Sequence, residues 1–511
     1  MKKALSLLLA LVMCFGLLSA CSSSTGEQSS NPSATTGTET STGGEQDTTL
    51  RALTLVASET FNPLVNGNGD KPVYHALFDC LFRFDNDGNV IPMLVDTYEV
   101  DGLDVTMKLR QDVTFSDGNP LTADDVLFSY NTVLEDPTLR YNMTLISTGM
   151  EKVDDYTIVL HLVNSYCKWQ NILAELLYII EEETYDTSAD YSSTAPVGSG
   201  PYTLESVDAS RKVTLKARDD YWNGAPEFKT VEVSAGVEDS TALISLQTGE
   251  VDLVAQMGLA SFTQAQQDEN LNCVSFDGWA TMGVMVQMGD DAFRQAVFHA
   301  INRDTIIQIC NNGNGTPSTN YFSPKVMGDY ADKAPFVGYD VDLAKECLAN
   351  TTVDLSQTYE IQVFDADSQA VAQCVVSDLS AIGINATVSY VDSNVFFDNL
   401  YGGNMQMGIT AMATNMVSVE DMMTMFDPDA GYPFNISDEL IEKIQTAPYI
   451  QDDAEREAAM IDLLNDLNEA CPWVPLYDSP TYCVYNKRVG NVLDCSSATY
   501  VYYFGDMTIE G

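Results

Sequence analysis

Enzymatic chemistry needs nucleophiles, general bases or metal ligands at suitable spacing, and this sequence offers few of them. The three histidines, His75, His161 and His299, lie far apart and in no recognisable catalytic or metal-binding context. Residues 198–200 read Gly-Ser-Gly and do not form the G-x-S-x-G turn that exposes a nucleophilic serine. We therefore predict a protein that is not an enzyme and that carries no catalytic residue, no metal ion and no cofactor.

Two acidic clusters resemble ligand sites at first sight. Residues 85–89 read Asp-Asn-Asp-Gly-Asn, but the glycine stands fourth, whereas a calcium loop of the EF-hand type needs it sixth, so a hairpin turn is favoured. Asp124 and Asp125 follow Thr122, which is the pattern of a capped helix start. Neither cluster predicts a metal site.

The charge balance excludes another class of partner. The chain of 511 residues has 74 acidic and 24 basic side chains, a formal net charge of −50. Nucleic-acid binding depends on Lys and Arg contacts to phosphates, so no nucleic-acid partner is expected. A hydrophobic fraction of 45% predicts a folded protein, and the length allows two or three domains. We expect a monomer.

The N-terminus carries an export signal. Lys2 and Lys3 precede an apolar stretch over residues 4–18, which is shorter than a membrane span and typical of a secretory signal peptide covering 1–20. The stretch ends Leu-Ser-Ala-Cys and resembles the bacterial lipobox, in which the cysteine, here Cys21, receives diacylglycerol. The alternative is an ordinary signal peptide followed by a coincidental cysteine.

Residues 21–49 are predicted to be a flexible, lipid-anchored linker. Between 22 and 49 the only aliphatic or aromatic residue is Ala34, and such a composition cannot bury enough surface to fold. Its reach is on the order of 30 Å. The predicted location is the outer face of the bacterial cytoplasmic membrane, extracellular or periplasmic, with the membrane contacted through the lipid.

Nine cysteines remain beyond Cys14 and Cys21, and an odd number cannot all pair with one another. No C-x-x-C spacing occurs among them. We predict that most are small, buried apolar residues.

Hydrophobic periodicity indicates mixed strands and helices. Alternating apolar residues predict a strand over 105–110, and helical spacing follows Thr122. Further on, a strand at 359–363, a helix over 371–382 that stops at Gly383, and a strand at 386–390 form the pattern of a parallel βαβ unit. Two amphipathic helices are predicted on either side of Pro448. The class is α/β with mixed sheets.

Four blocks of the sequence resemble the extracellular solute-binding proteins of family 5, which serve peptide and nickel ABC importers. Residues 94–137 are similar to a signature in which a hairpin leads to a DG-x-P turn and a helix that begins T-A-x-D-V. Residues 196–226 contain PVGSGPYTLE and ARDDYWNGAP, which resemble V-G-T-G-P-Y and N-x-x-Y-W-x-G-x-P. Residues 243–254 resemble L-x-x-G-E-x-D, and residues 290–306 resemble R-Q-A-x-x-x-A-I-x-R. The blocks stand in the family's order.

The resemblance implies a two-lobed periplasmic-binding-protein-like fold that encloses its ligand between the lobes. Lobe I would cover residues 50–283, with an extra inserted subdomain at about 73–190. Lobe II would cover 284–478, and residues 479–511 would return to lobe I. Hinge closure of this kind is a common way to bury a ligand.

Several residues of the blocks have scaffold roles on physical grounds. Gly198, Gly200 and Pro201 predict a tight bend, which we expect where a strand passes between the lobes. Gly249 is expected to end the helix that carries Ala242, because glycine adopts the left-handed cap conformation.

For ligand binding, the resemblance points to aromatic and polar side chains where chain segments cross between the lobes. The matching positions are Trp279, Thr281, Met282, Met412, Thr414, Asn415 and Tyr477. Trp279 fits a core residue equally well. The methionines between 405 and 425 fit either an adaptable apolar wall or ordinary core packing.

One departure from the family concerns the ligand. Peptide binders often carry W-x-x-D-Y-x-D-P, whose aspartate pairs with the peptide's α-amine, but residues 411–418 read AMATNMVS. A buried ammonium without a counter-charge is costly. Either another acid, Glu59 or Glu420, replaces the aspartate, or the ligand is not an ordinary peptide.

The resemblance implies a lipoprotein that captures a small solute, peptide or peptide-like, and delivers it to an ABC permease. A sensory lipoprotein that binds a signal peptide without uptake is the alternative within binding proteins. A secreted hydrolase on the same tether is the alternative from another class.

Overall fold

The structure, a computed structural model, describes residues 47–54, 57–65, 70–85, 89–413, 418–428, 432–492 and 502–510. The predicted signal peptide, Cys21 and the linker up to residue 46 lie outside this part of the chain. Within the described residues, no helix combines the length and apolarity that a membrane crossing needs.

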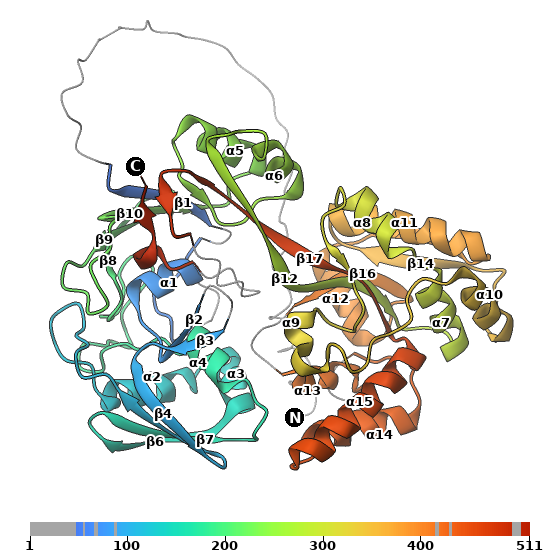
Figure 1. The fold of residues 1–511 in the computed structure, drawn as a ribbon, viewed down its shortest axis with the longest axis horizontal. Helices are drawn as coiled ribbons and strands as arrows, with labels where there is room; N and C mark the ends of the chain where they lie inside the picture. Colours follow the sequence, from blue (N-terminus) through green and yellow to red (C-terminus); the bar gives the residue numbers. More distant parts are fainter. Residues whose placement is uncertain are drawn as a thin grey trace, which may run out of the picture.

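The chain forms two lobes joined by two long antiparallel strands, β12 (Leu271–Val286) and β17 (Trp473–Asn486) (Figure 1). These strands lie at the centre of a mixed sheet with the order β15-β14-β16-β12-β17-β11-β1-β10-β9-β8, and β13 pairs with β17. The two-lobed α/β fold with mixed sheets is confirmed. The other strands of this sheet are β1 (Thr49–Thr54), β8 (Tyr202–Val207), β9 (Val213–Ala217), β10 (Thr230–Ala235), β11 (Leu253–Val254), β13 (Thr316–Pro317), β14 (Thr358–Val363), β15 (Asn385–Tyr390) and β16 (Met407–Ala413).

Lobe I contains a second sheet with the order β4-β5-β7-β6. The strand expected at 105–110 is β5, and Asp125 Oδ2 accepts a hydrogen bond from the Thr122 backbone N–H at 2.9 Å, which confirms the predicted helix start. One hydrophobic core runs through both sheets and includes C-terminal residues such as Phe504. The elements of lobe I outside the large sheet are α1 (Lys71–Leu77), β2 (Phe82–Phe84), β3 (Val90–Pro92), β4 (Val95–Asp101), β5 (Asp104–Leu109), α2 (Ala123–Val133), α3 (Pro137–Ile146), β6 (Ser147–Asp154), β7 (Thr157–Leu162), α4 (Trp169–Glu175), α5 (Asp239–Thr248), α6 (Leu259–Ala265), β18 (Val489–Gly490) and β19 (Thr508–Ile509).

Lobe II is built around the predicted βαβ unit. Strands β14 and β15 are parallel and α11 (Ala366–Ile382) connects them, ending at Gly383 with φ of 95°. Two further cores fill this lobe, one around Val363 and one around Met460. Its other helices are α7 (Asp291–Ala300), α8 (Arg303–Cys310), α9 (Pro324–Met327), α10 (Val341–Asn350), α12 (Ser393–Gly402), α13 (Val419–Met422), α14 (Asp438–Thr446) and α15 (Asp453–Ala470).

The second family block, residues 196–226, is held in place by a buried acid outside it. This acid is Asp79, which is 4% exposed. Its carboxylate accepts hydrogen bonds from Ser199 Oγ at 3.0 Å, Tyr221 OH at 2.9 Å and Trp222 Nε1 at 2.9 Å. Ser199 belongs to the first half of the block, and Tyr221 and Trp222 belong to the second. The Asp79 side chain thus binds both halves to the chain just after α1. Three donors compensate for the cost of burying the carboxylate.

The glycines of this block are required by close packing. A Cβ on Gly198 would lie 2.2 Å from the Leu77 carbonyl oxygen, and one on Gly200 would lie 2.5 Å from the Leu77 carbonyl carbon. The expectation that this bend passes between the lobes is wrong: it lies inside lobe I, against α1, because the small residues let the two backbones touch.

One further scaffold prediction is confirmed, and the structure adds a buried arginine that was not predicted. Gly249 ends α5 with φ of 75°, as expected. Arg294 of the fourth block is 1% exposed, and it donates to the Ala470 carbonyl at 2.6 Å and to the Gly289 carbonyl at 2.8 Å. This block therefore joins α7 to the end of α15.

Replacing Gly200 by alanine is expected to lower the free energy of unfolding by at least about 2 kcal/mol, because the added Cβ overlaps backbone atoms that cannot move independently. Urea unfolding followed by circular dichroism measures this change. Gly149→Ala is the matched control, since no atom lies within 4 Å of its added Cβ. Equal stability of the two variants would contradict the packing argument.

Candidate functional site

The pairing of β12 with β17 is irregular at two places, between Phe276 and Ala280 and between Met282 and Gly283. Phe276 of β12 pairs with Thr481 of β17, whereas Ala280 pairs with Ser479, so β12 has two extra residues over this interval. Bulges of this kind bend a strand and locally interrupt its ladder. The backbone of Trp279 lies in this interval, while its side chain is outside the described part of the structure. The first and larger of the two irregularities thus lies where β12 crosses from lobe I to lobe II.

A small polar cluster lies beside the bulge. Thr281 is fully buried, and its Oγ1 donates a hydrogen bond to Asp478 Oδ1 at 2.7 Å. Ser318 Oγ donates to the same oxygen at 3.2 Å, and Thr316 of β13 pairs with Asp478. The predicted site residue Thr281 thus connects β12 to β17 and to the segment around β13.

The predicted apolar site residues lie close to this cluster. Met282 is half-buried and pairs with Tyr477 across β12 and β17. Tyr477 is 3% exposed in one core of lobe II, and Met412 is 1% exposed in the other. Met405, Met407, Met423 and Met425 are buried as well, which agrees with the core-packing alternative for this run. Contact with a ligand by Met412 or Tyr477 stays a prediction.

Thr414 and Asn415 lie outside the described residues, so the structure does not place them. β16 ends at Ala413, and its neighbour β12 pairs Thr281 with Met412. The backbone therefore brings the end of β16 next to the bulge, as a site formed by crossing segments requires.

The two acids considered as replacements for the family's aspartate differ in their surroundings. Glu59 is exposed on the segment after β1. Glu420 is buried, accepts a hydrogen bond from Tyr330 OH at 2.8 Å and lies 3.8 Å from Arg456 Nε. Glu420 is thus paired with a cation of its own lobe, which makes it a poor counter-charge for a ligand ammonium.

Sequence reasoning missed a buried acid near Glu59. Asp70 stands at the N-cap position of α1, but its side chain does not cap the helix; it is 5% exposed and accepts a hydrogen bond from Thr54 Oγ1 at 2.6 Å. Its backbone N–H donates to Ser58 Oγ at 3.2 Å. Burial raises the pKa of Asp70 to about 7, against the lowering effect of the Thr54 hydrogen bond. The only sequence signal was an aspartate before a Lys-Pro helix start.

The lobes also touch away from the crossing strands. Ser165 Oγ, in the loop between β7 and α4, donates to Asp453 Oδ1 at 2.9 Å, and the guanidinium of Arg456 lies 4.3 Å from the ring centre of Tyr166. Arg456 Nη2 pairs with Asp453 at 2.7 Å. Asp453 is largely exposed, so its hydrogen bond with Ser165 contributes little, whereas Arg456 is buried against Tyr166.

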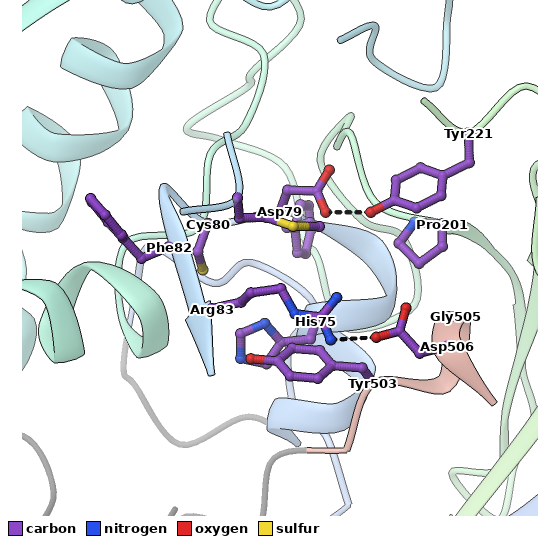
Figure 2. A pocket seen from close by; sticks show the side chains of 12 residues that line it. His75, Asp79, Cys80, Phe82, Arg83, Pro201, Tyr221, Tyr503, Gly505 and Asp506 are labelled. Atoms are coloured by element: carbon purple, nitrogen blue, oxygen red, sulfur yellow. Dashed lines mark hydrogen bonds and ion pairs between the residues drawn. The ribbon is translucent and has the colours of Figure 1, made fainter. Parts of the chain in front are cut away.

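A cavity of about 20 Å³ lies inside lobe I and is lined by polar groups that include His75, Asp79, Arg83 and Asp506 (Figure 2). Arg83 forms an ion pair with Asp506 and stacks 3.9 Å above the ring centre of Tyr503. Burial lowers the pKa of His75 to about 3, so its ring is neutral at physiological pH. The volume suits one water molecule rather than a solute.

An open pocket of about 290 Å³ adjoins this cavity on the surface of lobe I. Arg110 stacks 4.6 Å above the Trp222 ring, and its Nε and Nη2 bind the two carboxylate oxygens of Asp112 at 3.0 and 2.7 Å. The positive charge of Arg110 is already matched, so this pocket is a weak candidate for an anion. Among the described residues, no group of three or more His, Cys, Asp or Glu side chains is arranged to hold a metal ion.

Asp70 makes a pH-dependent contribution to stability with a definite sign. Because its folded-state pKa is raised above the unfolded value, the folded protein binds more protons between about pH 4 and 7, and the free energy of unfolding falls as pH rises through this window. Asp70→Asn should remove this fall, which urea unfolding at about pH 4, 6 and 8 would reveal. Glu59→Gln, at an exposed acid of the same segment, should keep the wild-type pH dependence. If the wild type, Asp70→Asn and Glu59→Gln showed the same pH dependence of the free energy of unfolding, the contribution assigned to Asp70 would be contradicted.

The family model described as "Bacterial extracellular solute-binding proteins, family 5 Middle" matches residues 89–434, more than half of the chain. The dipeptide-binding protein of Escherichia coli (strain K12) is 25% identical over 388 residues, covering 66% of this chain and 72% of that protein. The glutathione-binding protein GsiB of Salmonella paratyphi A is 27% identical over 341 residues, covering 64% and 66%. The chain thus aligns with about two thirds of the length of these relatives.

Solved structures of the same architecture cover nearly the whole chain. HbpA2 from Haemophilus parasuis has a TM-score of 0.77 at 22% identity, covering 91% of this chain and 100% of that one. DppA from Helicobacter pylori, an ABC transporter-associated periplasmic binding protein in complex with the peptide STSA, has a TM-score of 0.70 at 21% identity, covering 91% and 98%. At these identities the likeness concerns the fold. Together with the family match, it shows that the chain belongs to the bacterial extracellular solute-binding proteins of family 5, the solute-binding components of ABC importers.

Proposed function

We propose that this protein captures a peptide or peptide-like solute between its two lobes and delivers it, chemically unchanged, to an ABC permease. The observation that carries the proposal is the pair of continuous strands β12 and β17, which join two separately packed lobes through a bulge at residues 277–279. Bending there changes the angle between the lobes while each core stays intact. Such closure buries ligand surface and satisfies its polar groups, which is the source of affinity.

Two observations bear on the chemistry of the solute. One is the set of ligands that the protein's relatives bind, and the other is an aspartate that this chain lacks. The curated relatives bind a dipeptide or glutathione, which supports a small peptide-like ligand. Residues 411–418 lack the aspartate that receives a peptide α-amine in many family members, and Glu420 is paired with Arg456. The solute is therefore bound without that ion pair, or Glu59 supplies the negative charge. The proposed contacts are Trp279, Thr281, Met282, Met412, Thr414, Asn415, Tyr477 and Glu59.

The protein acts as a monomer at the outer face of the cytoplasmic membrane, held by a diacylglycerol group on Cys21. Two acyl chains anchor a protein stably where one does not. A sensory role without uptake is the second candidate within binding proteins. The hydrolase alternative is disfavoured because the family and the structural neighbours are binding proteins.

Solute capture is tested by native mass spectrometry of the purified mature chain, followed by fluorescence titration with the identified molecule or with defined di- to tetrapeptides. Trp279→Phe should abolish most of the fluorescence response and weaken binding at least about tenfold, because the smaller ring loses much of the proposed contact with the solute. Trp169→Phe, in lobe I, is the matched control and should keep both the fluorescence response and the affinity for the solute. An unchanged affinity in Trp279→Phe would remove this residue from the site. Equal radii of gyration with and without bound solute would contradict closure itself.

The lipid anchor is tested separately from solute binding. Cys21→Ala should move the protein from the membrane fraction to the soluble exported fraction and should prevent incorporation of a labelled fatty acid. Solute affinity should be unchanged, since the linker separates Cys21 from the folded lobes. Retention of the variant in the membrane would argue against lipidation at this residue.

A further inference from the structure

Two cysteines of lobe II lie in contact with each other. Cys310 is the last residue of α8 and Cys374 lies in the middle of α11, and their Sγ atoms are 3.8 Å apart. Both side chains are half-buried at the margin of the lobe II core. A disulfide bond requires the sulfur atoms to approach to about 2.05 Å. Rotation about the two side chains with a small helix shift can supply this approach.

The contact between Cys310 and Cys374 is held by the packing of α8 against α11, which meet at both the start and the end of α8. Asp378 lies one turn after Cys374 on the same face of α11, and its Oδ2 accepts a hydrogen bond from the Asn302 backbone N–H at 2.9 Å. Asn302 is the N-cap of α8, so Asp378 holds the start of this helix while Cys374 meets its end. Ile307 and Val375, one from each helix, are buried in the same core. The sulfur atoms therefore stay close.

We propose that Cys310 and Cys374 are a reversible disulfide site that links α8 to α11 when the exported protein meets a low-molecular-weight or protein disulfide. Disulfides form in extracellular and periplasmic compartments, where this family acts. One of the two thiols loses its proton to solvent, and its thiolate attacks the external disulfide and releases one thiol. The second protein thiolate then attacks the mixed disulfide and releases the other thiol. Two protein thiols and one external disulfide thus give one protein disulfide and two external thiols.

Other cysteines in the described part of the chain differ in geometry or accessibility. Cys273 and Cys483 lie on the neighbouring strands β12 and β17, but Cys273 pairs with Val484 and Val274 pairs with Cys483. Successive side chains of a strand alternate between faces, so these two thiols point to opposite sides of the sheet. Cys80 is fully buried, and burial raises the pKa of its thiol well above the ordinary value, which opposes reaction.

The disulfide would affect the crossing between the lobes. The chain runs from Cys310 through residues 311–315 into β13, which pairs with β17 at Tyr477 and Asp478. The Gly313 N–H donates to the Ile307 carbonyl at 3.0 Å, so this loop folds back on the end of α8. Linking α8 to α11 therefore restrains a segment in direct contact with the bending region.

The site is tested on the full mature protein incubated with oxidised glutathione and then alkylated under non-reducing conditions. We expect two fewer alkylated thiols than in the reduced protein and a proteolytic fragment in which Cys310 is linked to Cys374. Hydrogen exchange in residues 311–315 should slow on oxidation, and the thermal midpoint of lobe II should rise, because the crosslink restricts the unfolded chain. Reduction should reverse these changes.

Cys374→Ser should lose the linked fragment and the oxidation-dependent slowing of exchange, whereas Cys273→Ser, at another half-buried cysteine, should keep both. The peptide map of the wild-type protein gives the answer even if a variant fails to fold. Full alkylation of Cys310 and Cys374 after oxidation of the folded protein, or linkage of either one to a different cysteine, would overturn the proposal.

Discussion

The hydrogen-bond ladder between β12 and β17 is the interaction on which the rest of the molecule depends. Each strand begins in one lobe and ends in the other, so the same pair of strands contributes to the core of lobe I and to both cores of lobe II. A continuous ladder would make this connection rigid. The ladder is instead interrupted twice, by two extra residues of β12 between Phe276 and Ala280 and by a shift between Met282 and Gly283. Such irregularities bend a strand locally, and the proposed closure of the lobes uses them.

Around this connection, buried polar groups fix the two lobes internally. Asp79 receives three hydrogen bonds in lobe I, while Arg218, which is 5% exposed, donates to the carbonyls of Ser199 and Phe115, each at 3.0 Å. In lobe II, Arg294 donates to carbonyls at the end of α15 and before α7. These side chains satisfy backbone groups of irregular segments, which water would otherwise have to reach. The residues of the family blocks therefore chiefly stabilise each lobe internally.

A protein that captures and releases a solute between two lobes needs two stably folded lobes and a connection that can bend. A second contact between the lobes joins Ser165 to the exposed Asp453 and Tyr166 to the buried Arg456. In the Thr281–Asp478–Ser318 cluster beside the bulge, Thr281 and Ser318 are buried and Asp478 is half-buried, and their hydrogen bonds link three segments. This cluster therefore connects the crossing strands to the segment around β13, which follows the end of α8 in the chain.

The amino-acid sequence by itself determined the features that depend on near neighbours. These include the capped start of α2, the βαβ unit of lobe II and the helix ends at Gly249 and Gly383, whereas the export signal and the linker stay predictions. Local spacing and backbone conformation are sufficient for such signals. The family blocks added the two-lobed architecture, although the bend at Gly198 and Gly200 was placed wrongly because nothing local reveals that α1 packs against it.

Only the tertiary structure decided which side chains meet. Asp70 and Asp79 look like ordinary acids in the sequence, yet one is buried with a raised pKa and the other is the centre of a scaffold. Thr281 turns to Asp478, Glu420 is paired with Arg456, and Cys310 reaches Cys374 across 64 positions of the chain. These contacts arise from long-range packing, in which burial and partner identity depend on the whole fold and not on residue spacing.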